Sequence, residues 1–219
     1  MKKVLLPLLL LNFLVITAQN AEDRLGSWTL LAGNHKIAEK WNIPTIMIYQ
    51  TYDGVEDLHF VLARTGLGYQ VTPHLNVTLG YDYFYSKTLE KYSVTGKRLD
   101  RLFEQFNYSL KYNKLKIIQR VRFEQNWSKK NHKHSYSDRF RYRLKLIHPI
   151  TKHFFVDIFN EIFLNFEEPH FNQNRFSANI GYAFSPNYKM EVGYLRSDFK
   201  HKDYNRLRLA IIFKTDWTK

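Results

Sequence analysis

Long stretches of the chain alternate apolar and polar side chains residue by residue. One apolar row of this kind consists of Phe176, Ala178, Ile180, Tyr182 and Phe184. A period of two is that of a β-strand, in which successive side chains point to opposite faces of the sheet. From Trp41 onward, no stretch of similar length keeps the 3.6-residue period of an amphipathic helix. The pattern predicts an all-β fold.

Turn residues divide this region into about ten predicted strands. The predicted strands span 41–52, 58–70, 75–87, 97–112, 115–129, 135–148, 153–166, 171–184, 188–199 and 203–215. Most of them exceed the ~9–11 residues that a tilted strand needs to cross a bilayer. Strand length therefore favours an antiparallel transmembrane β-barrel.

The predicted connections alternate in character. Tight turns fall at 71–73, 112–114, 149–151 and 185–187, and longer or charged links fall at 53–57, 87–96, 129–134, 167–170 and 200–202. Short turns at one end and longer loops at the other are typical of an outer-membrane barrel, with the turns in the periplasm. Residues 24–33 look like one more strand, which would make the number odd. The sequence leaves this segment as a hairpin partner, an internal plug or part of a twelve-strand barrel.

The first residues have the form of a secretory signal peptide. Lys2 and Lys3 precede an apolar run from Val4 to Ile16, and the small residue Ala18 follows. The run is shorter than the ~20 residues of a membrane-spanning helix. The predicted divisions are a cleaved signal peptide at 1–18, an N-terminal segment at 19–40 and the barrel at 41–219.

The chain is strongly basic, with 33 Lys and Arg, 20 Asp and Glu, and a formal net charge of +13. Removal of the signal peptide takes away two lysines and no acid, which leaves 31 − 20 = +11. A basic excess favours a polyanionic neighbour, and export argues against nucleic acid and leaves lipid headgroups. The sequence contains no cysteine, which excludes a disulfide scaffold and a thiolate site.

Periodicity alone does not decide whether the apolar rows face a core or lipid. A soluble, lipocalin-like periplasmic or secreted barrel that binds an apolar ligand would turn Ile180 and Leu209 inward. Aromatic residues at the ends of the rows, such as Trp127 and Tyr188, favour the opposite arrangement with apolar rows toward lipid. We therefore expect an outer-membrane protein of a Gram-negative bacterium, with transmembrane strands and a polar interior.

On this interpretation, the charged residues of the strands point into the barrel. The expected interior network consists of Arg64, Asp82, Arg120, Arg122, Glu124, Arg139, Arg141, Arg143, Lys145, Asp157, Glu161, Arg175, Glu191, Arg206 and Arg208. Bidentate pairs of Arg122 or Arg141 with Glu124 or Glu161 would satisfy these charges. Such a network either holds the barrel together or lines a narrow anion-preferring passage. Both interpretations stay open.

Lysines of the predicted outer loops are solvated or pair with the phosphates of lipopolysaccharide. These lysines are Lys129, Lys130, Lys133, Lys200 and Lys202. A lipid-active hydrolase is a further alternative, for which His134 and Ser135 are the nearest candidates, but no third member of a triad is placed. His132 and His134 form no zinc motif, and no phosphate-binding glycine loop occurs. We expect no catalytic, metal or cofactor site, and the oligomeric state stays open.

Several motifs along the mature chain resemble one family. They are Gly26 to Trp28, Arg120 to Gln125, Arg139 to Leu144, Phe171 to Arg175, and Gly193 with Tyr194. In this order they resemble the bacteroidete outer-membrane family catalogued as domain of unknown function 2490. The resemblance implies a cell-envelope β-barrel with no assigned activity.

Two further features concern single strands. Arg208, Ala210 and Phe213 resemble in part the C-terminal signal that the barrel-assembly machinery reads, which implies that machinery as a partner during biogenesis. Near residue 100, where relatives often have Glu-x-Arg, Glu104 shares parity with the outward row. We expect a β-bulge near 103–105 to restore the alternation.

Overall fold

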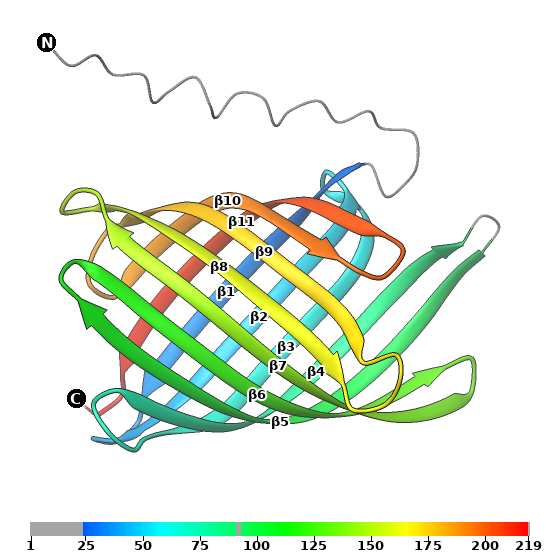
Figure 1. The fold of residues 1–219 in the computed structure, drawn as a ribbon, viewed down its shortest axis with the longest axis horizontal. Helices are drawn as coiled ribbons and strands as arrows, with labels where there is room; N and C mark the ends of the chain where they lie inside the picture. Colours follow the sequence, from blue (N-terminus) through cyan, green and yellow to red (C-terminus); the bar gives the residue numbers. More distant parts are fainter. Residues whose placement is uncertain (1–23, 91–92, 219) are drawn as a thin grey trace, which may run out of the picture.

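The computed structural model describes residues 24–90 and 93–218, and it shows one closed β-barrel (Figure 1). The strands are β1 (Leu25–Lys36), β2 (Trp41–Asp53), β3 (Glu56–Gln70), β4 (Leu75–Glu90), β5 (Ser93–Tyr112), β6 (Leu115–Lys130), β7 (Lys133–Pro149), β8 (Phe154–Asn165), β9 (Phe171–Ala183), β10 (Tyr188–Asp198) and β11 (Asp203–Asp216). Over these residues, no helix has the length and apolar character needed to cross a membrane. The predicted all-β barrel is confirmed as a fold.

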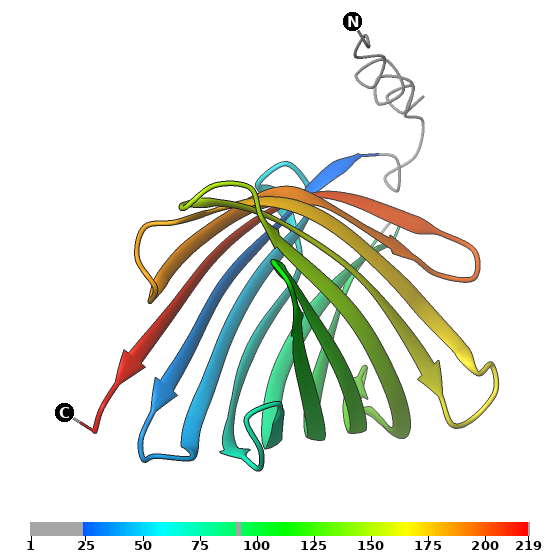
Figure 2. The same ribbon diagram turned by 60° about the vertical axis from the view of Figure 1, so that its left-hand side comes forward.

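Strands that are neighbours in sequence pair in antiparallel fashion around the barrel. The barrel closes differently, because β1 pairs with β11 in parallel from Leu25 opposite Asn205 to Lys36 opposite Asp216. Since β1 and β11 run in the same direction, the start of β1 and the end of β11 lie at opposite ends of the barrel (Figure 2). We call these the N-terminal end and the C-terminal end.

Eleven strands form the barrel, rather than ten or twelve. The expectation of an even number assumes that all strand pairs are antiparallel, and the parallel β1–β11 pair removes that constraint. The segment expected at 24–33 thus lies in the wall as β1, an additional strand that pairs with β2 and β11, and is not an internal plug. The predicted signal peptide at residues 1–18 falls outside the described residues.

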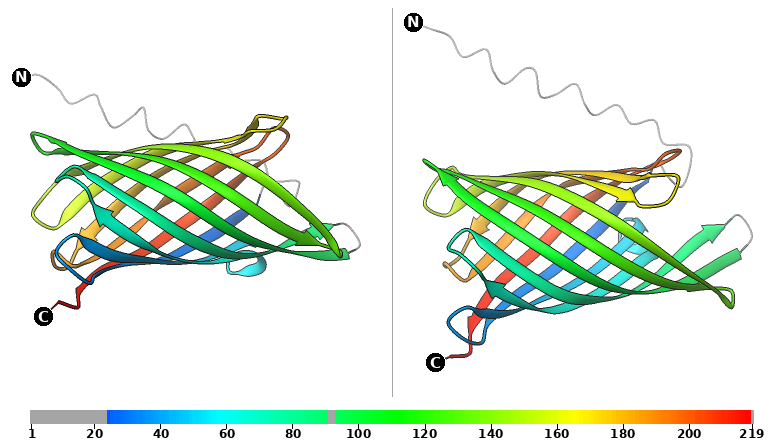
Figure 3. Two further views of the ribbon diagram at one scale, coloured as in Figure 1. Left: turned by 90° about the horizontal axis from the view of Figure 1, so that it is seen from below. Right: turned by 60° about the horizontal axis from the view of Figure 1, so that its bottom comes forward.

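The predicted tight turns all lie at the C-terminal end, and the predicted longer links all belong to the N-terminal end. At the N-terminal end, β4 with β5 and β6 with β7 extend furthest (Figure 1). These four strands have 16 to 20 residues, whereas the other seven have 11 to 15. The strands are tilted relative to the axis of the barrel (Figure 3), as closure of a sheet into a barrel requires.

The bulge expected near 103–105 is wrong. The pairing of β5 with β4 and β6 continues without a shift through these residues. Phe103 simply occupies an inward position, where its ring packs against Gly80 of β4, and Glu104 faces outward. The pairing register shifts elsewhere, between Gln50 and Thr51 and between Phe163 and Leu164. The aromatic residue Phe103 on the inward, mostly polar face therefore makes the sequence look as if the alternation shifts by one residue, although it does not.

Among the described residues, buried polar and charged side chains outnumber buried apolar ones. The apolar minority includes one cluster that joins strands from opposite parts of the wall. Its members are Trp28, Phe60, Leu62, Phe159 and Leu195. Because β1, β3, β8 and β10 are not all neighbours in the wall, this cluster lies across the interior. The charged residues fill the space beside it.

Candidate functional site

Adjacent strands β6 and β7 carry the centre of a buried charge network. Their alternation turns Arg120, Arg122 and Glu124 of β6 to the same side as Arg139, Arg141 and Arg143 of β7. The register then sets arginine opposite arginine at two of the three levels. Directly opposed like charges repel. Acids from these and neighbouring strands must therefore separate the guanidinium groups.

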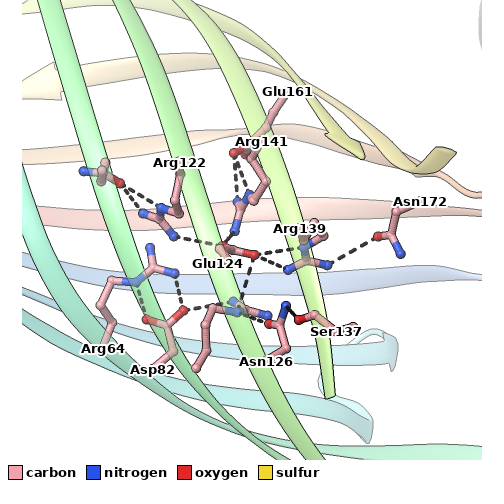
Figure 4. Close-up of polar contacts among 12 residues, drawn as sticks. Arg64, Asp82, Arg122, Glu124, Asn126, Ser137, Arg139, Arg141, Glu161 and Asn172 are labelled. Atoms are coloured by element: carbon pink, nitrogen blue, oxygen red, sulfur yellow. Dashed lines mark hydrogen bonds and ion pairs between the residues drawn. The ribbon is translucent and has the colours of Figure 1, made fainter. Parts of the chain in front are cut away.

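Glu124 is the acid at the middle of this arrangement, and it is 1% exposed. Its carboxylate contacts Arg139 Nη2 and Arg141 Nη1, each at 2.6 Å, in the view of Figure 4. Arg101 of β5 and Arg122 approach it at 3.4 and 3.5 Å. One buried carboxylate thus holds four guanidinium groups from three adjacent strands.

Arg141 links this centre to a second acid on β8. Its Nη1 donates to Glu124, and its Nη2 lies 2.8 Å from Glu161 Oε1. Arg120 of β6 reaches over β7 and contacts the same Glu161 oxygen at 2.5 Å. Because β6 and β8 are not neighbours in the wall, this contact is made inside the barrel.

Asp82 of β4 anchors the side of the network nearest β3. Arg64 forms a bidentate pair with it, at 2.5 and 2.7 Å, and Arg101 contacts it at 2.9 Å. The guanidinium groups of Arg64 and Arg122 also lie 4.9 and 4.3 Å from the centre of the Phe103 ring. A cation placed over an aromatic face is attracted by the ring. Phe103 is therefore part of the network although it carries no charge.

A second group of buried charges lies closer to the C-terminal end. Lys145 of β7 contacts Asp157 of β8 at 2.9 Å and Glu191 of β10 at 3.7 Å. Arg208 of β11 binds Glu191 at 2.8 Å, and Asn179 donates to Asp157 at 2.8 Å. In this group, the two cations Lys145 and Arg208 balance the charge of the two acids Asp157 and Glu191.

Three arginines in the described part of the chain make no hydrogen bond to an acid. Arg143 and Arg175 stack on aromatic rings, and Arg175 lies 4.6 Å from the ring of Trp28 across the barrel. The Nε atom of each is buried without a hydrogen-bond partner within the described structure. Arg206, which is 1% exposed, has only neutral hydrogen-bond partners of β2 and β3 within the described residues, and its guanidinium group lies 4.7 Å from the ring centre of Tyr204. The interior therefore keeps a positive excess.

The neutral partners of Arg206 lie at the N-terminal mouth of the barrel. Arg206 Nη2 lies 3.0 Å from His59 Nδ1, and its Nε donates to the amide oxygen of Gln50 at 2.6 Å when that oxygen is turned toward it. Tyr52 stacks on His59 with ring centres 4.2 Å apart. Burial, together with the charges of Arg206 and Lys202, lowers the pKa of His59 to about 3. His59 is therefore neutral at physiological pH.

The sequence-predicted interior residues all occupy positions on the buried side of their strands. Those that pair with an opposite charge are Arg64, Asp82, Arg120, Arg122, Glu124, Arg139, Arg141, Lys145, Asp157, Glu161, Glu191 and Arg208. Of the expected pairs, Arg141 binds both glutamates, whereas Arg122 donates mainly to Gln105. Sequence reasoning missed Arg101, whose parity would have found it, and His59, which has no such signal because it lies beside a register shift.

The residues weighed as catalytic lie apart. His134 and Ser135 follow each other in β7 and so point to opposite faces. The hydroxyl of Ser135 lies 2.7 Å from that of Ser128. Between residues 24 and 218, with 91–92 left aside, no three His, Cys, Asp or Glu side chains are grouped to hold a metal ion. The arrangement at His134 and Ser135 does not form a catalytic dyad.

The loop lysines lie at the N-terminal end. Lys129, Lys130 and Lys133 belong to the β6–β7 hairpin, and Lys200 and Lys202 belong to the connection from β10 to β11. The ammonium group of Lys202 lies 5.4 Å from the ring centre of Tyr204.

A family described as a protein of unknown function (DUF2490) matches residues 25–208, which begins at β1 and reaches into β11. No curated protein matches the chain.

Proposed function

Because the chain belongs to the DUF2490 family of proteins of unknown function, we propose its function from the barrel itself. The protein is an outer-membrane β-barrel of a Gram-negative bacterium. Its interior is closed by the buried charge network, and its role is structural. The barrel-assembly machinery inserts it, with the short turns of the C-terminal end in the periplasm.

The distribution of exposed and buried side chains carries this proposal. Met47, Leu79 and Ile180 are 60 to 62% exposed on the outer face, whereas Arg122 and Glu124 are each 1% exposed. A water-soluble barrel gains stability by burying apolar surface and leaving charges in water. The opposite distribution around a whole barrel is stable where lipid surrounds it. It argues against a lipocalin-like barrel with an apolar cavity.

Exposed aromatic residues at both ends support the same conclusion. The C-terminal end carries Trp41, Phe154, Phe184, Tyr188 and Trp217, and the N-terminal end carries Tyr83, Trp127, Tyr136 and Phe166. Aromatic side chains gather at the two interfaces of a membrane because one part of the ring is apolar and another polar. The strands between these two rims have the length to cross a bilayer.

The packed interior supports a closed barrel rather than an open pore. Arg141 connects acids on β6 and β8, and the cluster around Trp28 fills the adjoining space. A second candidate function is a narrow anion-preferring passage. It is favoured by Arg143, Arg175 and Arg206, which have no acid within hydrogen-bonding distance in the described structure.

Fractionation and reconstitution test both candidates. We expect the full chain to fractionate with the outer membrane and to migrate differently on gels before and after heating, as folded barrels do. In planar bilayers, we expect no steady conductance from the structural barrel. A steady anion-selective current would favour the second candidate instead. A fully soluble periplasmic product would overturn both.

A further inference from the structure

A groove on the outward face of β5, β6 and β7 lies apart from the buried network. It has a volume of about 510 Å³ and lies near the N-terminal end, where these strands extend furthest. Six of its lining residues give the groove its charged and aromatic character: Arg98, Asp100, Trp127, Lys129, His134 and Tyr136.

One row of this groove consists of nitrogen-bearing side chains. Arg98 of β5 is directly opposite Lys129 of β6, which is directly opposite His134 of β7. Neighbouring strands are ~4.8 Å apart, so the row presents three donor groups along ~10 Å. Aligned basic side chains repel one another unless an anion lies between them. All three side chains are exposed.

The next row, nearer the middle of the barrel, is aromatic. Trp127 and Tyr136 face each other across β6 and β7 with ring centres 5.4 Å apart, and they are 44% and 51% exposed. Asp100 completes this row and is already engaged, because it accepts two hydrogen bonds from Arg98, at 3.1 and 3.2 Å, and one from Tyr81. Asp100 thus fixes the Arg98 head and offsets its charge, while Lys129 adds a second cation.

The order of the two rows matches the edge of a membrane. The aromatic row continues the outward apolar face, where Phe123 and Phe140 lie below Trp127 and Tyr136 on the same strands. The basic row lies one step further from the middle of the barrel. Aromatic rings belong at the level of lipid headgroups, and basic side chains beside them attract anionic lipids.

We propose that this groove binds the phosphate group of a membrane lipid, of the lipopolysaccharide class, in the outer leaflet. The inference rests on the proposed membrane location. Trp127 and Tyr136 contact the sugar and upper acyl region, and Lys129, His134 and Arg98 donate to the phosphate oxygens. A phosphate at this position also relieves the repulsion along the basic row.

Binding of lipid A to the purified full chain in neutral detergent micelles tests the site. The variant carries Arg98→Gln and Lys129→Gln. The matched control carries Lys111→Gln and Lys114→Gln, which removes the same formal charge from β5 and the turn that follows it at the C-terminal end. A third variant, Lys129→Arg, keeps the charge at one position. Dephosphorylated lipid A and inorganic phosphate serve as comparison ligands.

We expect the Arg98→Gln/Lys129→Gln variant to bind lipid A about tenfold more weakly, and the control and Lys129→Arg to bind as the parent does. Dephosphorylated lipid A should bind the parent and the Arg98→Gln/Lys129→Gln variant with equal affinity. Equal weakening in variant and control, equal binding of both lipids, or equal competition by inorganic phosphate would overturn the proposal. Heat-modifiable migration of each variant in phosphatidylcholine vesicles is measured separately, so that failure of the membrane proposal is distinguished from failure of this site.

Discussion

The ring of Phe103 on β5 occupies the space that a side chain at Gly80 on β4 would need. The two residues are directly opposite in the register, and a Cβ built on Gly80 would overlap the end of the ring. The ring cannot move aside freely, since Arg64 and Arg122 lie close to it. Gly181 and Phe155 repeat the relationship on β9 and β8. Glycine on the inward face therefore leaves room for an aromatic ring of the neighbouring strand.

Gly80→Ala is expected to destabilise the barrel by about 1–3 kcal/mol, because overpacking forces the Phe103 ring and its two arginines to shift. The urea dependence of heat-modifiable migration measures the change. Gly80→Ala combined with Phe103→Leu should recover part of the loss, since the shorter side chain leaves room for the methyl group. Equal stability of Gly80→Ala and the parent would contradict the packing argument.

Glu124→Gln is expected to destabilise the barrel by about 3–5 kcal/mol, because it leaves four guanidinium groups without their shared buried carboxylate. Glu104→Gln is the matched control, because Glu104 is a glutamate on the neighbouring strand that faces outward and, among the described residues, accepts a hydrogen bond only from Gln125, at 3.4 Å. We expect this control to be neutral or slightly stabilising in the same unfolding experiment. A similar loss in both variants would show that the number of charges matters and their burial does not.

Trp28→Ala combined with Phe159→Ala is expected to open the interior. Both rings belong to the cluster that crosses the barrel, and each truncation to alanine costs about 3–5 kcal/mol of stability. Single-channel recording should detect a steady current in the variant, carried by anions because Arg143 and Arg175 lie beside the gap. Phe176→Ala, on the outward face, removes a ring without touching the cluster and should stay silent. A silent double variant of wild-type stability would contradict this interpretation of the interior.

The stability of the barrel is expected to decrease as the pH is lowered, because His59 becomes protonated in the unfolded chain before it does so in the folded barrel. His59 lies at the mouth, nearer the hairpin than Tyr49, the last half-exposed aromatic residue of β2, and so lies outside the membrane-spanning part. Its pKa is about 3 in the folded barrel and about 6.5 in an unfolded chain. Between these values, the unfolded state binds more protons, so acid favours unfolding.

Unfolding midpoints at pH 7 and pH 5 measure this effect, and His59→Gln should reduce the difference between them. The groups that face His59 are Arg206, Lys202, Gln50, Tyr52 and Tyr204. Burial raises the pKa of Tyr52 to about 12 and lowers the pKa of Arg206 to about 10, and both values lie well above pH 7. His74→Gln, in the β3–β4 turn, is a control that should leave the pH dependence unchanged. An unchanged dependence in His59→Gln would contradict a neutral buried imidazole.

The side of each strand that a residue occupies could be predicted from the sequence, because the alternation of a strand is local. Glu161 illustrates what could not be predicted. The sequence favours Arg122 and Arg141 as its partners, but the register brings Arg120 and Arg141 to it. Register between strands depends on contacts distant in sequence, which a single sequence does not contain. The same reason explains the missed pairing of β1 with β11, whose partners are some 180 residues apart.

Phe103 and His59 show two further limits. Phe103 imitates a change of parity, because a large ring on the polar face is unusual unless a glycine opposite makes room for it. His59 lies beside the register shift at Gln50, where alternation no longer tells the inner from the outer side. Local pattern therefore locates the rows, and exceptions within them depend on neighbours across the sheet.

The parallel pairing of β1 with β11 makes the two ends of the barrel distinguishable by experiment. Because both strands run in the same direction, a label placed just before Leu25 and another placed just after Asp216 lie at opposite ends of the barrel. In a barrel that spans a membrane, these two labels lie on opposite sides of that membrane. A membrane-impermeant reagent applied to whole cells would reach only one of these labels. The parallel β1–β11 pair of this odd-stranded barrel therefore allows the orientation of the protein in a membrane to be measured with two labels.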